Sequence, residues 1–185
     1  MWKRTYERIR KYTLPERAIN INEYASYDGE QNPAGAVFYI SQFERHDSHG
    51  LRTNWASQGQ LHDFLDNLLV KNSGRDYSPA GEWHVYQYYS QAMKGNQVGT
   101  SPSDDELFEV YVTRGGSAGT VKILAAIRPV AGKKTNYKFY GTNVSTAVGA
   151  PVDLGTFKHT IKNDQIRFFV AADDRTQAFA FEFEV

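Results

Sequence analysis

The chain has 185 residues, with 21 Lys and Arg against 21 Asp and Glu, so its formal net charge is zero. This balance argues against a protein that binds nucleic acid through bulk positive charge. The sequence contains no cysteine, which excludes disulfides, thiolate zinc sites and cysteine nucleophiles. No apolar run is long enough to span a membrane. Aromatic residues make up 14% of the chain, and their large flat surfaces suit β cores as well as sugar- or peptide-binding grooves.

The first hundred residues alternate between helical and extended patterns. An amphipathic helix begins near Trp2 and ends before Pro15, because the residue preceding a proline avoids the helical region. A strand-length segment follows over residues 18–24. Pro33 stands where the first turn of a helix tolerates it, and the helical pattern continues over residues 36–45.

The same alternation continues toward residue 100. Gly50 is expected to stop the preceding helix, and residues 51–56 form a short strand candidate. Leucines and a phenylalanine over residues 61–69 follow helical spacing, whereas residues 72–80 are expected to be a loop. Residues 83–93 have a second helical aromatic pattern that ends near Gly95.

Residues after about 104 show strand patterns only. In the last of them Phe179, Phe181 and Phe183 alternate with Glu182 and Glu184, so we expect the three rings to be buried together. Short strands with one apolar face are typical of a β-sandwich. The expected strands cover residues 107–113, 120–128, 137–140, 165–170 and 177–185.

The predicted fold class is therefore α/β followed by all-β, with units at 1–100 and 104–185. The polar stretch 99–105, which contains Pro102, separates them. Two strand–helix units make a poor independent core, because a parallel sheet needs both faces covered along several strands. The first unit is thus expected to be one piece of a larger fold.

Glu23 is the leading candidate for chemistry. Strand alternation places it on the same face as Ile19 and Ile21, near the carboxyl end of its strand. Parallel α/β barrels carry their catalytic groups at such ends. The alternative interpretation is a structural glutamate held by a neighbouring arginine.

Several segments resemble those of retaining glycosidases of the large (β/α)8-barrel clan, in particular glycoside hydrolase family 39. Residues 19–25 resemble the nucleophile segment on the seventh barrel strand. The other segments recur in the same order in fungal and bacterial members, and the match covers residues 1 to about 130. They are Pro33-Ala34-Gly35, Tyr39-Ile40, Glu44-Arg45, Gly50-Leu51-Arg52, Asn54-Trp55, Leu61 to Leu65, Gly81 to Tyr89 and Thr100 to Ser103.

The resemblance implies a partial TIM barrel, comprising the last two βα units, followed by a C-terminal antiparallel β-sandwich. It also implies a carbohydrate substrate, an extracellular location, no cofactor and no metal. Glu23 would be the catalytic nucleophile, Trp55 an aromatic floor under the sugar, and Tyr24 a group that orients the sugar or the carboxylate. Exposed barrel strands lead us to expect self-association.

One departure from the family pattern is large. A retaining glycosidase needs two carboxylic acids about 5 Å apart, and in this clan the acid/base follows the fourth strand. No residue of this chain maps to that position, so the resemblance implies a C-terminal fragment and leaves its own enzymatic activity open. The alternative function is a non-catalytic carbohydrate-binding or structural β-sandwich module.

The other motifs are better explained by structural roles than by functional ones. His46, Asp47 and His49 lie close together, but their spacing matches no known metal motif. Gly115-Gly116 joins two expected strands and lacks a phosphate-loop lysine, so a hairpin turn explains it. The positive residues of the first helix fit a solvated outer helix better than a nucleic-acid contact. The sequon at Asn143 carries little weight alone.

Overall fold

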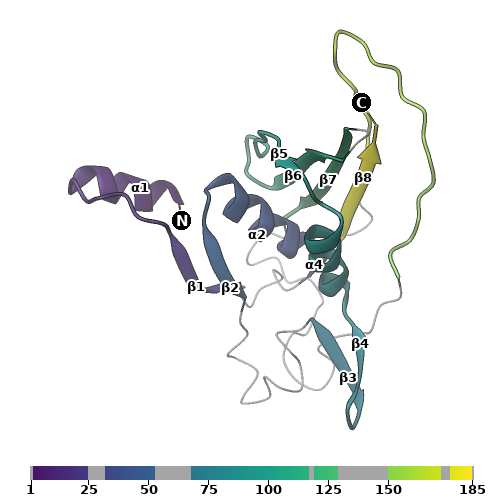
Figure 1. Cartoon of the computed structure of the whole chain (residues 1–185), viewed down its shortest axis with the longest axis horizontal. Coiled ribbons are helices and arrows are strands. Elements are labelled where there is room, and N and C mark those ends of the chain that lie inside the picture. Colours follow the sequence, from purple (N-terminus) through teal and green to yellow (C-terminus); the bar gives the residue numbers. More distant parts are fainter. Residues whose placement is uncertain are drawn as a thin grey trace.

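The computed structural model describes residues 2–24, 32–52, 68–116, 119–128, 150–171 and 176–184. These residues form three layers: a pair of parallel strands, a middle layer of two helices, and a four-stranded antiparallel sheet (Figure 1). The expected mixture of helices and strands with antiparallel sheet is confirmed. Within the described ranges the strands do not close into a barrel.

Helix α1, Trp2–Lys11, forms where the sequence predicts it. Its buried residue is Trp2, whose ring stacks on His46 with centroids 4.9 Å apart and meets Phe43 edge-on at 6.1 Å. The basic residues Arg8, Arg10 and Lys11 lie in the last turn, where positive charge stabilises the negative end of the helix dipole.

Strand β1 (Asn20–Tyr24), helix α2 (Pro33–Arg45) and strand β2 (His49–Arg52) form a β–α–β unit, because the two strands pair in parallel. The Asn32 side chain accepts a hydrogen bond from the Gly35 N–H at 3.0 Å. This cap and Pro33 in the first turn start α2 at its predicted position.

The prediction that Gly50 stops α2 is wrong. The helix already ends at Arg45, and the chain reverses through Asp47, which has a φ of 44°. Gly50 lies inside β2, where a Cβ would clash with the Phe43 ring and stand 2.8 Å from the Tyr24 ring. This glycine therefore permits close approach of the strand to aromatic side chains.

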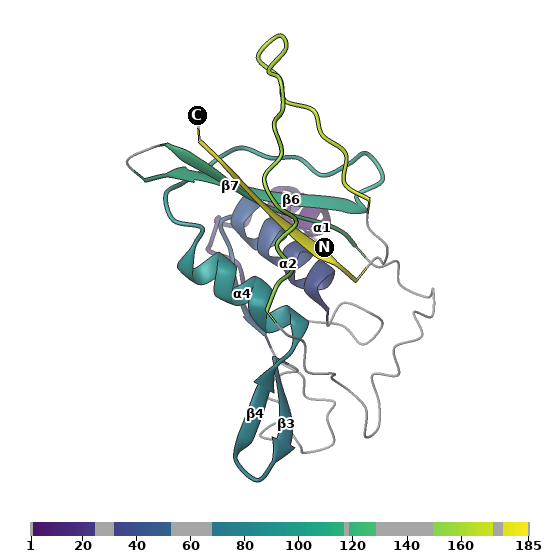
Figure 2. The same ribbon diagram turned by 90° about the vertical axis from the view of Figure 1, so that its right-hand side faces the viewer.

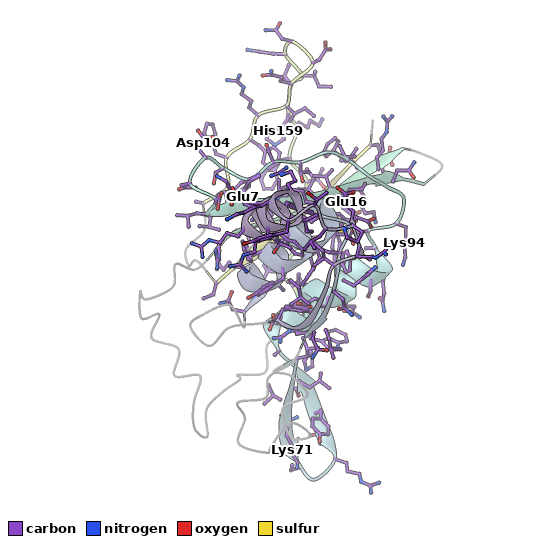
Figure 3. The ribbon with its side chains drawn as sticks, turned by 90° about the vertical axis from the view of Figure 1, so that its left-hand side faces the viewer. Glu7, Glu16, Lys71, Lys94, Asp104 and His159 are labelled. Carbon is purple, nitrogen blue, oxygen red and sulfur yellow. The ribbon has the colours of Figure 1, made fainter. Side chains whose placement is uncertain are left out.

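Residues 68–80 also differ from the prediction. Leu68 and Leu69 are not helical, and the expected loop is an antiparallel hairpin of β3 (Leu69–Ser73) and β4 (Asp76–Pro79). Gly74, with a φ of 55°, occupies the tight turn between them. The rest of the expected 61–69 helix lies outside the described residues. The hairpin projects from the body, with Lys71 near its outer end (Figure 3).

Helix α4, Gly81–Gln91, follows the hairpin directly and confirms the helix predicted over residues 83–93. The chain then adds the sheet β5-β6-β7-β8, with every neighbouring pair antiparallel. Figure 2 shows α2 and α4 side by side against one face of this sheet. The strands are β5 (Asn96–Gln97), β6 (Phe108–Gly115), β7 (Thr120–Ile127) and β8 (Ala178–Phe183).

One hydrophobic core joins the helices to the sheet. It spans the polar stretch 99–105 that separates the two predicted units, since it contains residues from both sides. Its buried members are Ala34, Ala36, Val37, Ile40, Val85, Met93, Tyr111, Leu124 and Ala126.

The sheet face that points away from the helices is less buried than predicted. Phe179, Phe181 and Phe183 share one face, as predicted, but their rings are half-buried rather than buried. Residues 165–170 do not form the predicted strand, because among the described residues only Gln165 finds a ladder partner, at Lys162. The strand expected at 137–140 lies outside the described residues. Only one layer of the expected sandwich is therefore described.

Candidate functional site

The carboxyl ends of the two parallel strands lie next to each other. Tyr24, the last residue of β1, is in register with Arg52, the last residue of β2. Open α/β sheets and barrels bind ligands at the carboxyl edge of their parallel strands. This edge is therefore the candidate functional site.

The pairing of β1 with β2 is irregular immediately before this edge. Between the pairs Ile21–Gly50 and Tyr24–Arg52, β1 advances three residues while β2 advances two. The extra residue is a bulge-like insertion that covers Asn22 and Glu23. Bulges bend a strand and re-aim its side chains, and they are over-represented beside active sites.

Tyr24 is embedded in an aromatic cluster. Its ring centroid lies 4.8 Å from those of Tyr39 and Phe43 on α2. Its hydroxyl is 3.0 Å from the Tyr86 hydroxyl on α4. The end of β1 is therefore fixed by both helices of the middle layer.

Arg52 forms a buried ion pair with Glu82, through Nη2 and Oε2. The side chains are 7% and 3% exposed, so solvent screens the pair little. Burial disfavours the charge on Arg52, but the Glu82 carboxylate outweighs it and raises the guanidinium pKa. No acceptor among the described residues reaches Nε or Nη1 of Arg52.

Tyr86 connects the two interactions. The Arg52 guanidinium carbon lies 6.0 Å from the Tyr86 ring centroid, within reach of a cation–π contact. Burial, the Glu82 carboxylate and the neighbouring Tyr24 hold the pKa of the Tyr86 hydroxyl well above its usual value. Tyr86 therefore stays protonated and serves as a neutral hydrogen-bonding group.

The structure describes the positions of two of the three predicted site residues. Glu23 is part of β1, within the bulged stretch and directly before Tyr24. Tyr24 packs in the aromatic cluster, and its role toward a substrate stays a prediction. Trp55 lies outside the described residues.

Arg52, Glu82 and Tyr86 were not predicted as site residues from the sequence, although all three lie in segments that resemble glycoside hydrolase family 39. A signal was available for one of them. Glu82 is an acidic residue in the first turn of a helix, where a carboxylate is stabilised by the helix dipole. Its pairing with Arg52, 30 residues earlier, depends on tertiary structure.

The described ranges contain no group of three or more metal-binding side chains, and His46 stacks on Trp2. In those ranges there is also no helix of the length and apolarity needed to cross a bilayer. No protein-family model, curated protein or solved structure matches this chain.

Proposed function

We propose that residues 20–52 belong to the catalytic (β/α)8 barrel of a retaining glycosidase and that Glu23 is its nucleophile. The observation that carries the proposal is the position of Glu23, in a bulged stretch at the carboxyl end of a strand that pairs in parallel with β2. The segment resemblance around Glu23 supports the same role.

In this proposal the Glu23 carboxylate attacks the anomeric carbon, and the bond to the leaving oxygen breaks. A carboxylic acid from elsewhere in the complete barrel protonates that oxygen. Water then hydrolyses the glycosyl–Glu23 ester, and the second carboxylate takes its proton. No residue of this chain is assigned to that second role.

The other site residues have supporting roles in the proposal. Trp55 would lie under the sugar ring. Tyr24, Tyr86 and the Arg52–Glu82 pair would hold the ends of β1 and β2 in place, because a nucleophile must be held within a fraction of an ångström of its productive geometry. The substrate is an extracellular carbohydrate, and the β5–β8 sheet is one layer of a β-sandwich that accompanies the barrel.

A second candidate is a non-catalytic carbohydrate-binding module. It is favoured by one observation: Phe157 and Phe169 expose their rings to solvent, and a flat ring can pack against the C–H face of a sugar. If binding of a soluble polysaccharide, measured by calorimetry, is lost in Phe169→Ala but unchanged in Glu23→Gln, this candidate replaces the first.

The decisive experiment traps the nucleophile. A panel of 2-deoxy-2-fluoro glycosides with a dinitrophenolate leaving group needs no acid assistance. We expect mass spectrometry to find the sugar ester on Glu23 in a chain extended upstream by the remaining strand–helix units. Glu23→Gln should abolish labelling, and Glu16→Gln, a matched change at an exposed glutamate, should not.

Two outcomes would contradict the proposal. One is labelling of the extended chain on a different carboxylate. The other is full turnover of a glycoside by the Glu23→Ala variant. The 185-residue chain alone should hydrolyse no natural glycoside, because the proposal assigns the acid/base role to none of its residues.

A further inference from the structure

The outer face of the β5–β8 sheet is apolar. The pairing of β6, β7 and β8 puts alternate residues on the face away from the helices, since their neighbours Tyr111, Leu124 and Ala126 belong to the helix-side core. The outer residues include Val110, Val112, Ile123, Ala125, Phe179, Phe181 and Phe183. An apolar sheet face of this extent needs a cover.

The segment 150–171 contains the start of a β-hairpin. Lys162 and Gln165 exchange two backbone hydrogen bonds of 3.0 Å each. Asn163 and Asp164 between them have φ values of 51° and 59°. Two successive left-handed residues closed by such a pair match a type I′ turn, the commonest connection of a tight hairpin.

This turn fixes the register of the two arms. Counting outward, Ile161 stands opposite Ile166, His159 opposite Phe168, and Phe157 opposite Val170. The His159 and Phe168 rings lie 5.6 Å apart, in agreement with this register. These six residues share one face, because cross-strand partners point the same way. The other face has the polar residues Lys158, Thr160, Lys162, Gln165 and Arg167, together with Phe169.

The second arm already turns its apolar face toward the sheet. Ile166, Phe168 and Val170 are 38%, 37% and 39% exposed, whereas Phe169 between them is 101% exposed. The Phe168 ring meets Phe181 on the outer face of β8 with centroids 5.0 Å apart. Figure 2 shows the segment 150–171 passing in front of the sheet. The first arm is further from any cover, with Phe157 and Ile161 68% and 63% exposed.

We propose that the outer face of the sheet is the docking surface of the hairpin 157–170 of the same chain. On docking, Phe157, Ile161 and Phe168 pack against Phe179, Phe181 and their neighbours. The face with Lys158, Lys162 and Arg167 turns to solvent. The inference is independent of any catalytic role of Glu23.

The observations favour the chain's own hairpin over that of a second copy. Phe168 and Phe181 are separated by only 13 positions in the sequence, so the connecting chain keeps the hairpin at high effective concentration beside its own sheet. The outer face is then closed to a sugar. Phe169 alone among the hairpin aromatics stays exposed.

The absence of cysteine makes a crosslinking test free of background. In the Phe168→Cys/Phe181→Cys variant we expect dibromobimane, which bridges only neighbouring thiols, to give a fluorescent crosslink at monomer mass. Its yield should be several-fold above that of the matched pair Phe169→Cys/Phe181→Cys. Equal yields in the two pairs would overturn the docking, and a crosslink at dimer mass would assign the surface to a second copy.

Amide exchange of the unmodified chain provides the independent measurement, which needs no variant. Docking should protect the amides of residues 158–169 on alternate positions, to the same degree at all protein concentrations. Exchange of these amides at the rate of an unstructured peptide would overturn the proposal. Protection that grows with concentration would instead show exchange of hairpins between copies.

Discussion

At the scale of single residues, the most consequential side chain outside the candidate site is Glu109. It is fully buried in β6, yet it is charged. Arg45 binds it through Nη2 at 2.7 Å and Nη1 at 3.4 Å, and the Gln42 amide donates to it at 2.5 Å. Both partners lie on α2, so this cluster attaches the central helix to the sheet.

Removing one partner of a buried ion pair leaves the other charge without compensation. We therefore expect Glu109→Ala to lower the free energy of unfolding by about 3–5 kcal/mol. Urea unfolding followed by circular dichroism measures this. The Arg45→Met/Glu109→Leu double variant should lose less than Glu109→Ala alone, because apolar side chains of similar size can replace a buried pair. A loss below about 1 kcal/mol in Glu109→Ala would show that the pair is not structurally important.

The Glu109 cluster and the Arg52–Glu82 pair are interactions that could not be predicted from the sequence. Periodicity places Glu109 on a strand but cannot say that Arg45, 64 positions earlier, neutralises it. Glu23 could be selected from the sequence, because position near a strand end is a local property, whereas Tyr24 was selected through the family resemblance. Arg52, Glu82 and Tyr86 could not be selected, since their significance arises from contacts between α4 and the ends of β1 and β2.

At the scale of elements, aromatic contacts of Trp2 and Tyr6 hold α1 against the end of α2. His46 follows the last turn of α2, stacks on Trp2 and lies 5.7 Å from the ring of Tyr6. Burial and the neighbouring Arg45 lower the pKa of His46 below its usual 6.5. The neutral imidazole is therefore the form that this packing stabilises.

The direction of the pH effect follows. A histidine whose pKa is lower in the folded state than in the unfolded state contributes its full stabilisation of the fold above the unfolded pKa of 6.5. This stabilisation is lost as the pH falls toward the folded pKa. Between pH 7 and about pH 5 we expect the amides of α1 to exchange progressively faster, relative to those of α2. His46→Gln should remove the pH dependence. If α1 exchange is flat over this range in the unmodified chain, His46 does not control its docking.

Elements also differ in how well sequence alone predicts them. Trp2–Lys11, Pro33–Arg45 and Gly81–Gln91 were predictable, because helical spacing and Pro33 in a first turn are local signals. The β3–β4 hairpin was missed, since its short strands follow leucines that also fit helical spacing and only Gly74 marks the turn. The bulge in β1 has no sequence signature, because it depends on pairing with β2.

At the scale of the whole molecule, α2 is the element on which both sheets rely. Tyr39 and Phe43 contact Tyr24 of β1, and Ala36, Val37 and Ile40 belong to the core shared with β6 and β7. The parallel pair and the antiparallel sheet are thus two outer layers on one helical layer. The four-stranded sheet has one face on this layer, whereas within the described ranges the parallel pair consists of two strands only.

A two-stranded parallel sheet leaves backbone donors and acceptors along its outer edges, and such edges recruit strands from other molecules. Leu51 of β2 is 57% exposed and adds apolar surface beside one edge. We therefore expect the 185-residue chain to self-associate, with an average mass by multi-angle light scattering that rises with concentration. Leu51→Lys should reduce the association, because like charges at an edge repel each other. Phe169→Lys, an equally drastic change on the distant hairpin, should leave it unchanged. A monomer at every concentration, or equal effects of the two lysine variants, would show that the parallel strands are not the associating surface.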